Sequence, residues 1–176
     1  MSLPNFPSPW MTEEHHTLQD SVARFFKERW VPQTPAWREA GSMPRETWNE
    51  AGAQGLLCAA MPEAYGGADA DKLYSVVQFE ELSRAGVTGI GYSLHSEIVA
   101  PYILHYGTPE QKARFLPKMA TGEMIGAIAM SEPAAGSDLQ GIKATAIQQP
   151  DGSYLLNGSK TFITNGQHAN LIIVVC

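Results

Sequence analysis

The chain has 176 residues, of which 44% are hydrophobic and 17% are charged, and its formal net charge is -6. This composition is typical of a globular protein, and the length allows one large domain or one domain with part of another. The negative charge disfavours nucleic-acid binding, because nucleic-acid-binding proteins carry basic patches. No apolar run approaches the roughly 20 residues of a membrane-spanning helix. The two cysteines, Cys58 and Cys176, lack metal-ligand spacing, so we predict no metal site and a reducing, cytoplasmic location.

The N-terminal part of the chain predicts a succession of helices. The first begins after Thr12, a capping residue followed by two glutamates, and ends at Pro32. The second covers residues 43–52, where tryptophan and alanine give an apolar face. A third begins at Asp69 or Asp71, both of which are suitable N-cap residues.

Two further helices follow before the pattern changes. Residues 93–106 are largely apolar and predict a buried helix, which Pro101 kinks because proline lacks a backbone N–H. Thr108 and Gln111 form a capping-box pattern at the start of the next helix, and Gly122 ends that helix. These signals complete an expected N-terminal domain of five or six helices.

Beyond Gly122, short apolar runs separated by turn residues replace the helical spacing. The predicted strands cover residues 125–130, 143–148, 153–156, 160–164 and 171–175. We therefore expect an α+β fold, with an all-helical domain over residues 1–123 and the beginning of a β domain over residues 124–176. The chain stops directly after an apolar strand, an arrangement that natural proteins usually pair or blunt. We infer from this that the chain is the N-terminal piece of a longer protein.

Residues 125–138 join a short apolar strand to a polar loop rich in small residues. The loop supplies hydroxyl and carboxylate groups, including Ser131 and Asp138. Gly136 permits unusual backbone dihedrals, which would let N–H groups approach a ligand closely. From the residues alone, an ordinary turn in which serine and aspartate cap their own backbone is an equal alternative.

Two segments of the sequence resemble one known family. Residues 129–141 closely resemble the first signature of the acyl-CoA dehydrogenases, which are FAD flavoenzymes, and residues 157–166 resemble that family's second flavin-contacting strand. The resemblance extends from about residue 12 to the end of the chain. The sequences of residues 93–96 and 125–130 are most similar to those of the long-chain branch. The resemblance implies a helical domain, a β-barrel and a C-terminal helical bundle, and the bundle is absent from this chain.

The resemblance implies an FAD site built from both motifs. Its expected cofactor-binding residues are Ile128, Ala129, Met130, Ser131, Gly136, Ser137, Phe162, Ile163 and Thr164. Ser131 and Thr164 would lie near the flavin N5 and pyrimidine carbonyls, and Ser137 would reach both the pyrophosphate and the acyl-CoA. Phe162, where the family more often has tryptophan, would lie against the isoalloxazine. Ser131 and Ala134 also depart from the threonine and glycine that are common in the motif.

The substrate side of the site is less defined. Resemblance places Leu94 near the base of the acyl-tail pocket, with plain helix packing as the alternative reading. We interpret His95 as a hydrogen-bonded core histidine. The family's catalytic base is a glutamate in the C-terminal bundle, beyond Cys176, so no catalytic residue is assigned. We therefore expect this chain alone to be inactive and to hold FAD poorly, because the bundle and a neighbouring subunit complete the adenine site.

The function implied by the resemblance is α,β-dehydrogenation of a fatty acyl-CoA with hydride transfer to FAD, as in fatty acid β-oxidation. The implied partners are the acyl-CoA substrate, an electron-transfer flavoprotein and further copies of the chain in a homotetramer. Two alternatives remain open. One is another flavin enzyme on the same scaffold, such as a nitroalkane oxidase or flavin monooxygenase, for which Phe162 is a mild hint. The other is a non-catalytic binding module.

Overall fold

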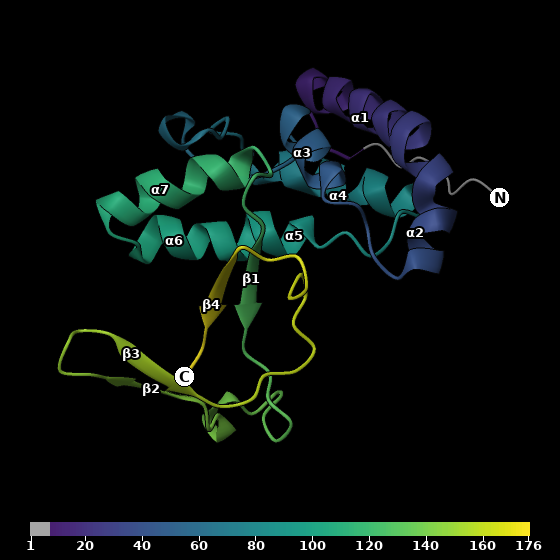
Figure 1. The fold of residues 1–176 in the computed structure, drawn as a ribbon. Coiled ribbons are helices and arrows are strands. Elements are labelled where there is room, and N and C mark those ends of the chain that lie inside the picture. Colours follow the sequence, from purple (N-terminus) through teal and green to yellow (C-terminus); the bar gives the residue numbers. More distant parts are fainter. Residues whose placement is uncertain (1–7) are drawn as a thin grey trace.

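The computed structural model describes residues 8–176, in which the helices precede the strands (Figure 1). The helices are α1 (Glu13–Phe25), α2 (Thr34–Ala40), α3 (Glu46–Ala53), α4 (Lys72–Arg84), α5 (Tyr92–Leu94), α6 (Ala100–Tyr106) and α7 (Pro109–Ala120). The strands are β1 (Gly126–Ala129), β2 (Thr145–Gln148), β3 (Tyr154–Asn157) and β4 (Leu171–Val174). This order confirms the predicted fold class, a helical domain followed by the beginning of a sheet domain. No α-helix follows α7 within the described residues.

The helical backbone does not end at Pro32, which corrects the sequence-based prediction. A π-helical segment, Phe26–Trp30, and a 3₁₀ turn, Val31–Gln33, lead directly into α2. Pro32 and Pro35 both lie in first turns, where a missing N–H removes no intrahelical bond. The two prolines are therefore compatible with continuous helical backbone between α1 and α2.

Two helix starts form as the sequence predicts. Asp71 is the N-cap of α4, and its carboxylate accepts a hydrogen bond from the Leu73 N–H at 2.8 Å. At the start of α7 the capping box is complete, because Thr108 and Gln111 each bond the other's backbone N–H, at 3.3 and 2.8 Å. Such boxes satisfy amide donors that would otherwise lack an intrahelical partner.

The predicted helix over residues 93–106 is also present. It consists of α5, a π-helical segment His95–Val99, and α6, which run on from one another along the lower edge of the helical domain (Figure 1). The irregular segment ends just before Pro101, whose ring nitrogen cannot donate the bond that a regular helix requires.

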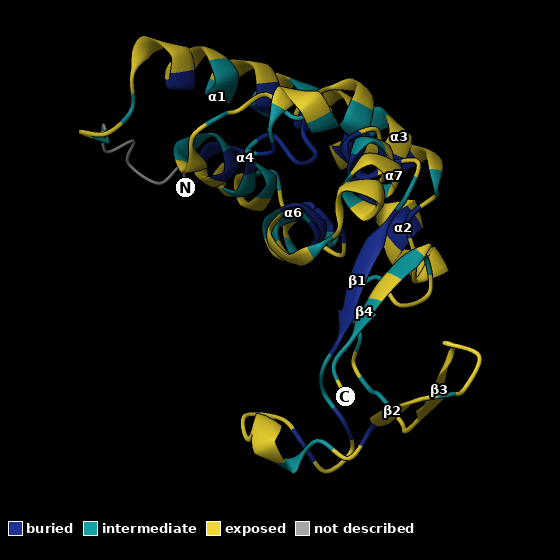
Figure 2. Cartoon of the chain, turned by 90° about the vertical axis from the view of Figure 1, so that its left-hand side faces the viewer, coloured by how far each residue is buried: buried dark blue, intermediate teal, exposed yellow. Residues whose placement is uncertain are grey.

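The core has two hydrophobic clusters. The first is rich in aromatic residues and includes Phe26, Trp30, Trp37, Trp48 and Tyr92. The second includes Met61, Val99, Leu116, Met119 and Ile128, so it joins α6 and α7 to the first strand. Figure 2 shows the result: β1 is buried along its whole length, whereas β2 and β3 are exposed.

The strands form two separate pairs. β1 pairs in parallel with β4, with Gly126 opposite Leu171, and β2 pairs antiparallel with β3. Four of the five predicted strands are therefore present, with bounds within two residues of the prediction at each end. The fifth, residues 160–164, is wrong. These residues form no strand, and Phe162 at their centre has a φ of +57°, in the left-handed region, which does not occur in an extended strand.

Tyr92 provides a test of the core. Its side chain is fully buried, and its hydroxyl has no hydrogen-bond partner among the described residues. Burial raises the pKa of this hydroxyl, and an unpaired buried hydroxyl costs about 1–3 kcal/mol. We expect Tyr92→Phe to raise the free energy of unfolding by about 1 kcal/mol, measured by urea denaturation.

The matched control is Tyr74→Phe. The Tyr74 hydroxyl bonds the Glu14 carboxylate, so its removal loses a hydrogen bond and should not stabilise the protein. A lower urea midpoint for Tyr92→Phe than for Tyr74→Phe would contradict the assignment.

Candidate functional site

The first motif begins in the core and emerges at the surface. Its predicted cofactor-binding residues become more exposed along the chain. Ile128 and Ala129 are buried in β1, and Met130 and Ser131 are half-buried just after the strand. Gly136 and Ser137 are exposed in the loop. The strand thus fixes one end of the motif, and the loop presents the other end to solvent.

The loop after Ser131 is a compact turn. The Glu132 N–H donates to the Ala135 carbonyl at 2.8 Å, and the Ala135 N–H donates back at 3.1 Å. The Asp138 carboxylate accepts from the Gln140 N–H at 3.1 Å, so Asp138 caps its own backbone, as the turn alternative requires. Gly136 has no positive φ, and an added Cβ would meet nothing within 4 Å. The expectation that it adopts unusual dihedrals is wrong.

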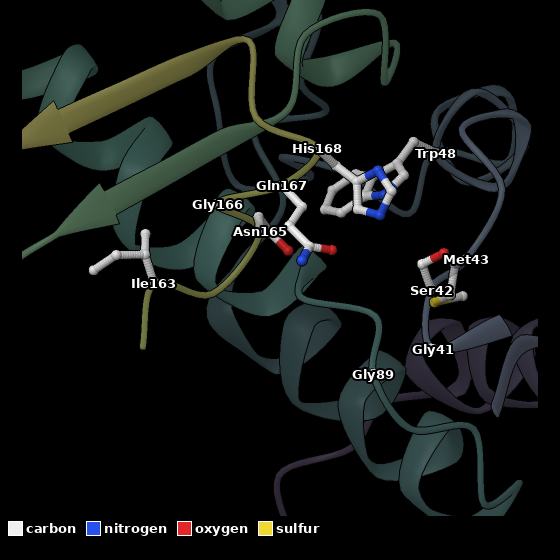
Figure 3. Close-up of a pocket in the computed structure, with 10 residues that line it drawn as sticks. All are labelled: Gly41, Ser42, Met43, Trp48, Gly89, Ile163, Asn165, Gly166, Gln167 and His168. Carbon is white, nitrogen blue, oxygen red and sulfur yellow. The ribbon is translucent and has the colours of Figure 1, made fainter. Parts of the chain in front are cut away.

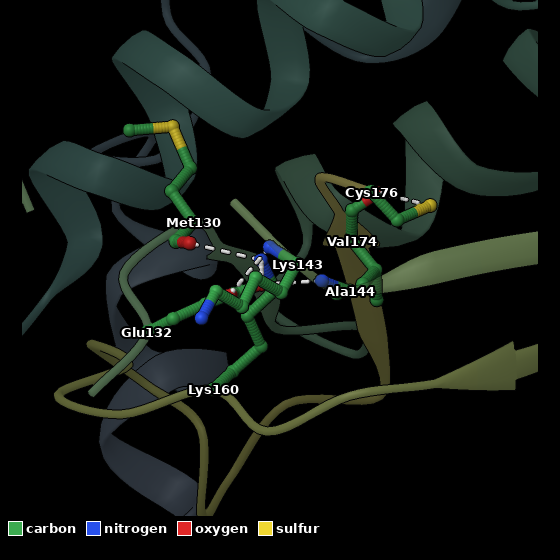
Figure 4. Close-up of polar contacts among 7 residues, drawn as sticks. All are labelled: Met130, Glu132, Lys143, Ala144, Lys160, Val174 and Cys176. Carbon is green, nitrogen blue, oxygen red and sulfur yellow. Dashed lines mark hydrogen bonds and ion pairs between the residues drawn. The ribbon is translucent and has the colours of Figure 1, made fainter. Parts of the chain in front are cut away.

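An ion pair joins the first motif to the second (Figure 4). The Glu132 carboxylate is buried and accepts from the backbone N–H groups of Lys143 and Ala144, at 2.8 and 2.9 Å. It also accepts from Lys160 Nζ at 2.8 Å, and Lys160 donates to the Met130 carbonyl at 2.9 Å. The Lys160 hydrogen bond, assisted by the two backbone N–H groups, lowers the pKa of Glu132 to about 2. Sequence reasoning missed Lys160, because the pairing spans 28 residues.

The structure brings the two motifs side by side. The Thr161 N–H donates to the Ser131 carbonyl at 3.0 Å, so the middle of the second motif lies against the beginning of the first. Phe162 follows with 93% of its side chain exposed, while Ile163 is half-buried and Thr164 is exposed. A bulky residue with positive φ is held in a strained backbone conformation, and such strain concentrates at functional sites.

The second motif also contacts the turn before α5. Asn165 Nδ2 donates to the carbonyls of Gly91 and Gly126, at 2.9 and 3.1 Å. Leu94, three residues after Gly91, is partly buried and packs against the second hydrophobic cluster. The helix-packing alternative requires this contact, and the role of Leu94 at the acyl-tail pocket stays a prediction. Neither motif pattern identified Asn165 as a bridging residue.

A cavity of about 240 Å³ lies beside the second motif (Figure 3). It is lined by residues 41–43, Trp48 and Gly89 on the helical side, and by Ile163 and residues 165–168 on the other. Arg45 donates to the carbonyls of Glu123 and His168, which ties the 163–168 loop to the start of α3. No sequence signal marked this cavity.

Within residues 8–176, no helix has the length and apolar character needed to cross a bilayer. The same residues contain no group of three or more histidine, cysteine or acidic side chains placed to hold a metal ion.

Comparison with known proteins agrees with this architecture. A crystal structure of an acyl-CoA dehydrogenase from Geobacillus kaustophilus superposes with a TM-score of 0.92 at 48% identity, covering 97% of this chain and 44% of that one. The family profile described as acyl-CoA dehydrogenase, N-terminal domain, matches residues 12–123, and the profile for the middle domain matches residues 127–176. A helical domain leading into the start of a sheet domain is thus the N-terminal and middle part of the acyl-CoA dehydrogenase scaffold. The chain belongs to the acyl-CoA dehydrogenase family.

The relatives agree with the predicted branch. The mouse long-chain specific acyl-CoA dehydrogenase, mitochondrial, is 48% identical over 164 residues, which is 93% of this chain and 38% of the mouse protein. An acyl-CoA dehydrogenase from Bacillus anthracis, solved in complex with FAD, has a TM-score of 0.85 at 35% identity, over 96% of this chain and 30% of that one. The chain therefore spans well under half the length of these relatives.

The strain at Phe162 can be measured. Glycine adopts positive φ freely, whereas other residues lose about 1 kcal/mol or more there. We expect Phe162→Gly to cause no loss, and up to about 1 kcal/mol gain, in the free energy of unfolding measured with urea. Tyr154→Gly is the control, because Tyr154 is also an exposed aromatic residue, lies in β3 and has no positive φ. An equal loss of stability in both variants would show that Phe162 is unstrained.

The Glu132–Lys160 pair predicts a specific pH dependence. Because the native pKa of Glu132 lies near 2 and the ordinary value is 4.5, the unfolded chain binds the proton more readily. The carboxylate therefore stabilises the fold above about pH 4.5, and this contribution is lost as the pH falls toward about 2. We expect Glu132→Gln to have a lower urea midpoint at neutral pH and a smaller further decrease on acidification.

The control is Glu80→Gln, since Glu80 is an exposed carboxylate that pairs with Arg84 on the same helix. Exposed pairs of this kind contribute little. If the two variants had the same midpoint at neutral pH, the structural role of Glu132 would be refuted.

Proposed function

We propose that this chain is the N-terminal part of an acyl-CoA dehydrogenase that oxidises a fatty acyl-CoA at its α and β carbons with FAD as hydride acceptor. The observation that carries the proposal is the backbone hydrogen bond from Thr161 to Ser131, which aligns the two family motifs as neighbouring walls. The ion pair between Glu132 and Lys160 supports the same arrangement, because it fixes both walls through side chains.

The groups at this edge fit a flavin. Flavins need an aromatic or apolar surface beside the ring and hydrogen-bond donors at the ring heteroatoms. Phe162 provides an exposed aromatic face, Ser131 provides a hydroxyl group from the first motif, and Thr164 provides one from the second. When bound, FAD would accept the hydride that leaves the β carbon. The residues of this chain would orient the ring and supply the hydrogen bonds that favour its reduced form.

Further roles follow from the family resemblance. Main-chain groups of Ile128, Ala129 and Met130 would lie along the ring edge, and Ile163 would support the second wall. Gly136 and Ser137 would lie at the pyrophosphate, with Ser137 also reaching the acyl-CoA. Leu94 would line the acyl-tail pocket from α5.

The remaining machinery lies outside these residues. The family's base, a glutamate of the C-terminal bundle, has no counterpart among the residues assigned here. We propose that residues 1–123 and 124–176 are separate domains, and that the 176-residue chain alone neither catalyses the reaction nor holds FAD tightly.

The proposed partners are a fatty acyl-CoA, an electron-transfer flavoprotein as electron acceptor, and further copies of the full-length chain in a tetramer. A cytoplasmic location remains a prediction, and the mouse relative is named as mitochondrial. Both cysteines are free thiols, which is compatible with a reducing compartment.

The decisive experiment uses the protein encoded by the complete reading frame. We expect it to bind FAD and appear yellow, and to bleach when a fatty acyl-CoA is added without oxygen. The 176-residue chain should show no bleaching, and Phe162→Ala in the full-length protein should weaken FAD binding, whereas Tyr154→Ala should not. A full-length protein that remains colourless in excess FAD would refute the proposal.

A further inference from the structure

Gly126, the first residue of β1, is held by two side chains from distant parts of the sequence. Its N–H donates to His95 Nδ1 at 2.9 Å, and its carbonyl accepts from Asn165 Nδ2 at 3.1 Å. The first partner lies 31 residues before Gly126 and the second lies 39 residues after it. Both main-chain polar groups of this residue are therefore satisfied by side chains.

Each of the two side chains has a second anchor. The other ring nitrogen of His95 lies 3.1 Å from the Met119 carbonyl, so Nε2 carries the hydrogen and Nδ1 is free to accept. His95 is fully buried, and burial lowers its pKa to about 4, which keeps the ring neutral. Asn165 donates its second amide hydrogen to the Gly91 carbonyl at 2.9 Å. Its positive φ is one that asparagine tolerates better than most residues.

The two glycines permit this close approach. A Cβ at Gly91 would lie 2.2 Å from Asn165 Oδ1 and 2.7 Å from Thr164 Cγ2. A Cβ at Gly126 would lie 2.7 Å from Val99 Cγ1. A side chain at position 91 would displace the Asn165 and Thr164 side chains, and one at position 126 would displace the Val99 side chain. Glycine at position 91 therefore leaves room for the Asn165 side chain to reach the Gly91 carbonyl.

We propose that His95 and Asn165 are positioning residues that clamp both flavin-contacting segments onto the helix that carries Leu94. The inference rests on the proposed function. β1 runs from the clamped residue to Ala129, two residues before Ser131, and Asn165 directly follows Thr164. The turn at Gly91, where Asn165 has its second anchor, leads into α5, which carries Leu94 three residues later. The clamp thus fixes the distance between the two flavin-contacting segments and the helix that carries Leu94, on the substrate side of the same site.

The consequence for the reaction is geometric. The clamp contributes no group to the chemistry, but it sets how the acyl chain and the flavin face one another. A misplacement of about 1 Å can reduce a reaction rate by about 100-fold. Loosening the clamp should therefore slow the reduction of bound flavin at saturating acyl-CoA, beyond any effect on stability.

The test compares two identical substitutions in the same loop. Asn165→Asp replaces the donating amide with an acceptor that repels both carbonyls. Asn170→Asp is the matched control, because Asn170 uses its oxygen, which accepts from the Ile125 N–H at 3.0 Å and is retained in aspartate. Both variants are made in the full-length protein.

The first readout is amide hydrogen exchange of the flavin-free protein. Asn165→Asp should accelerate exchange in residues 91–94, 126–131 and 161–166 together, and Asn170→Asp should not. Unchanged exchange in those segments would overturn the clamp, whether or not the protein binds flavin.

The second readout is the rate of flavin reduction by saturating acyl-CoA in flavin-loaded protein. We expect a decrease of about 10- to 100-fold for Asn165→Asp and little change for Asn170→Asp. At His95, asparagine should retain more of the rate than leucine, because its oxygen can accept from the Gly126 N–H. An unchanged rate in folded Asn165→Asp would refute the positioning role. A wild-type protein that takes up no flavin would instead refute the proposed function, while the exchange result still decides whether the clamp joins these segments.

Discussion

The structure depends on satisfying the backbone of one buried strand, β1, which has a single neighbouring strand among residues 8–176. β1 is buried at all four positions and pairs with β4 along one edge. A buried backbone polar group without a partner costs as much as a lost hydrogen bond, so the strand needs partners at its ends as well. At its start they are His95 and Asn165, and after its last residue they are Lys160 and Thr161. Every one of these partners lies in a segment that also forms part of the candidate site. The contacts that stabilise the strand therefore also hold the site segments in place.

The Glu132–Lys160 pair illustrates how a charge is tolerated at this position. A buried ion pair gains little net stability when desolvation is counted, and it is tolerated only when its remaining hydrogen-bonding groups are satisfied. Here the carboxylate accepts from two backbone N–H groups besides the ammonium, and the ammonium also donates to Met130. The pair also specifies geometry. It draws residues 143 and 144 back to residue 132, which closes the loop of the first motif, and it attaches that closed loop to the second motif.

The features that could be predicted from the sequence are those determined by neighbouring residues in the chain. The caps at Asp71 and Thr108 are found from a few neighbouring residues, because each is satisfied within its own turn. The segment 160–164 was misread for the opposite reason. Its threonine, phenylalanine and isoleucine favour strands locally, but Thr161 is bonded to Ser131, and the backbone then turns at Phe162 with positive φ. Tertiary contacts override propensity there, at the position where function is proposed.

The missed helix α2 and the missed bridging residues have different causes. From neighbouring residues alone, Pro32 and Pro35 predict turns. They are compatible with helical backbone here because each lies in the first turn of its helix, where a backbone N–H makes no intrahelical bond. Resemblance located the two motifs but gave no indication that Lys160, His95 and Asn165 hold them together. These residues bond partners that lie 24 to 74 positions away in the sequence, and no spacing pattern encodes such pairings.

The rigidity of the site therefore comes from the helical side. β2 and β3 are exposed at all eight positions, including the apolar Ile147, Leu155 and Leu156, and an isolated two-stranded hairpin is at best marginally stable in water (Figure 2). The helical domain has its own aromatic core, and its second cluster extends onto Ile128. β1 packs against that second cluster through Ile128, and Gly126 bonds His95 in the π-helical segment. β1 therefore connects the helical domain to the two motifs. The proposed flavin site is thus connected to the α5–α6 helix through Gly126 and not through the exposed hairpin.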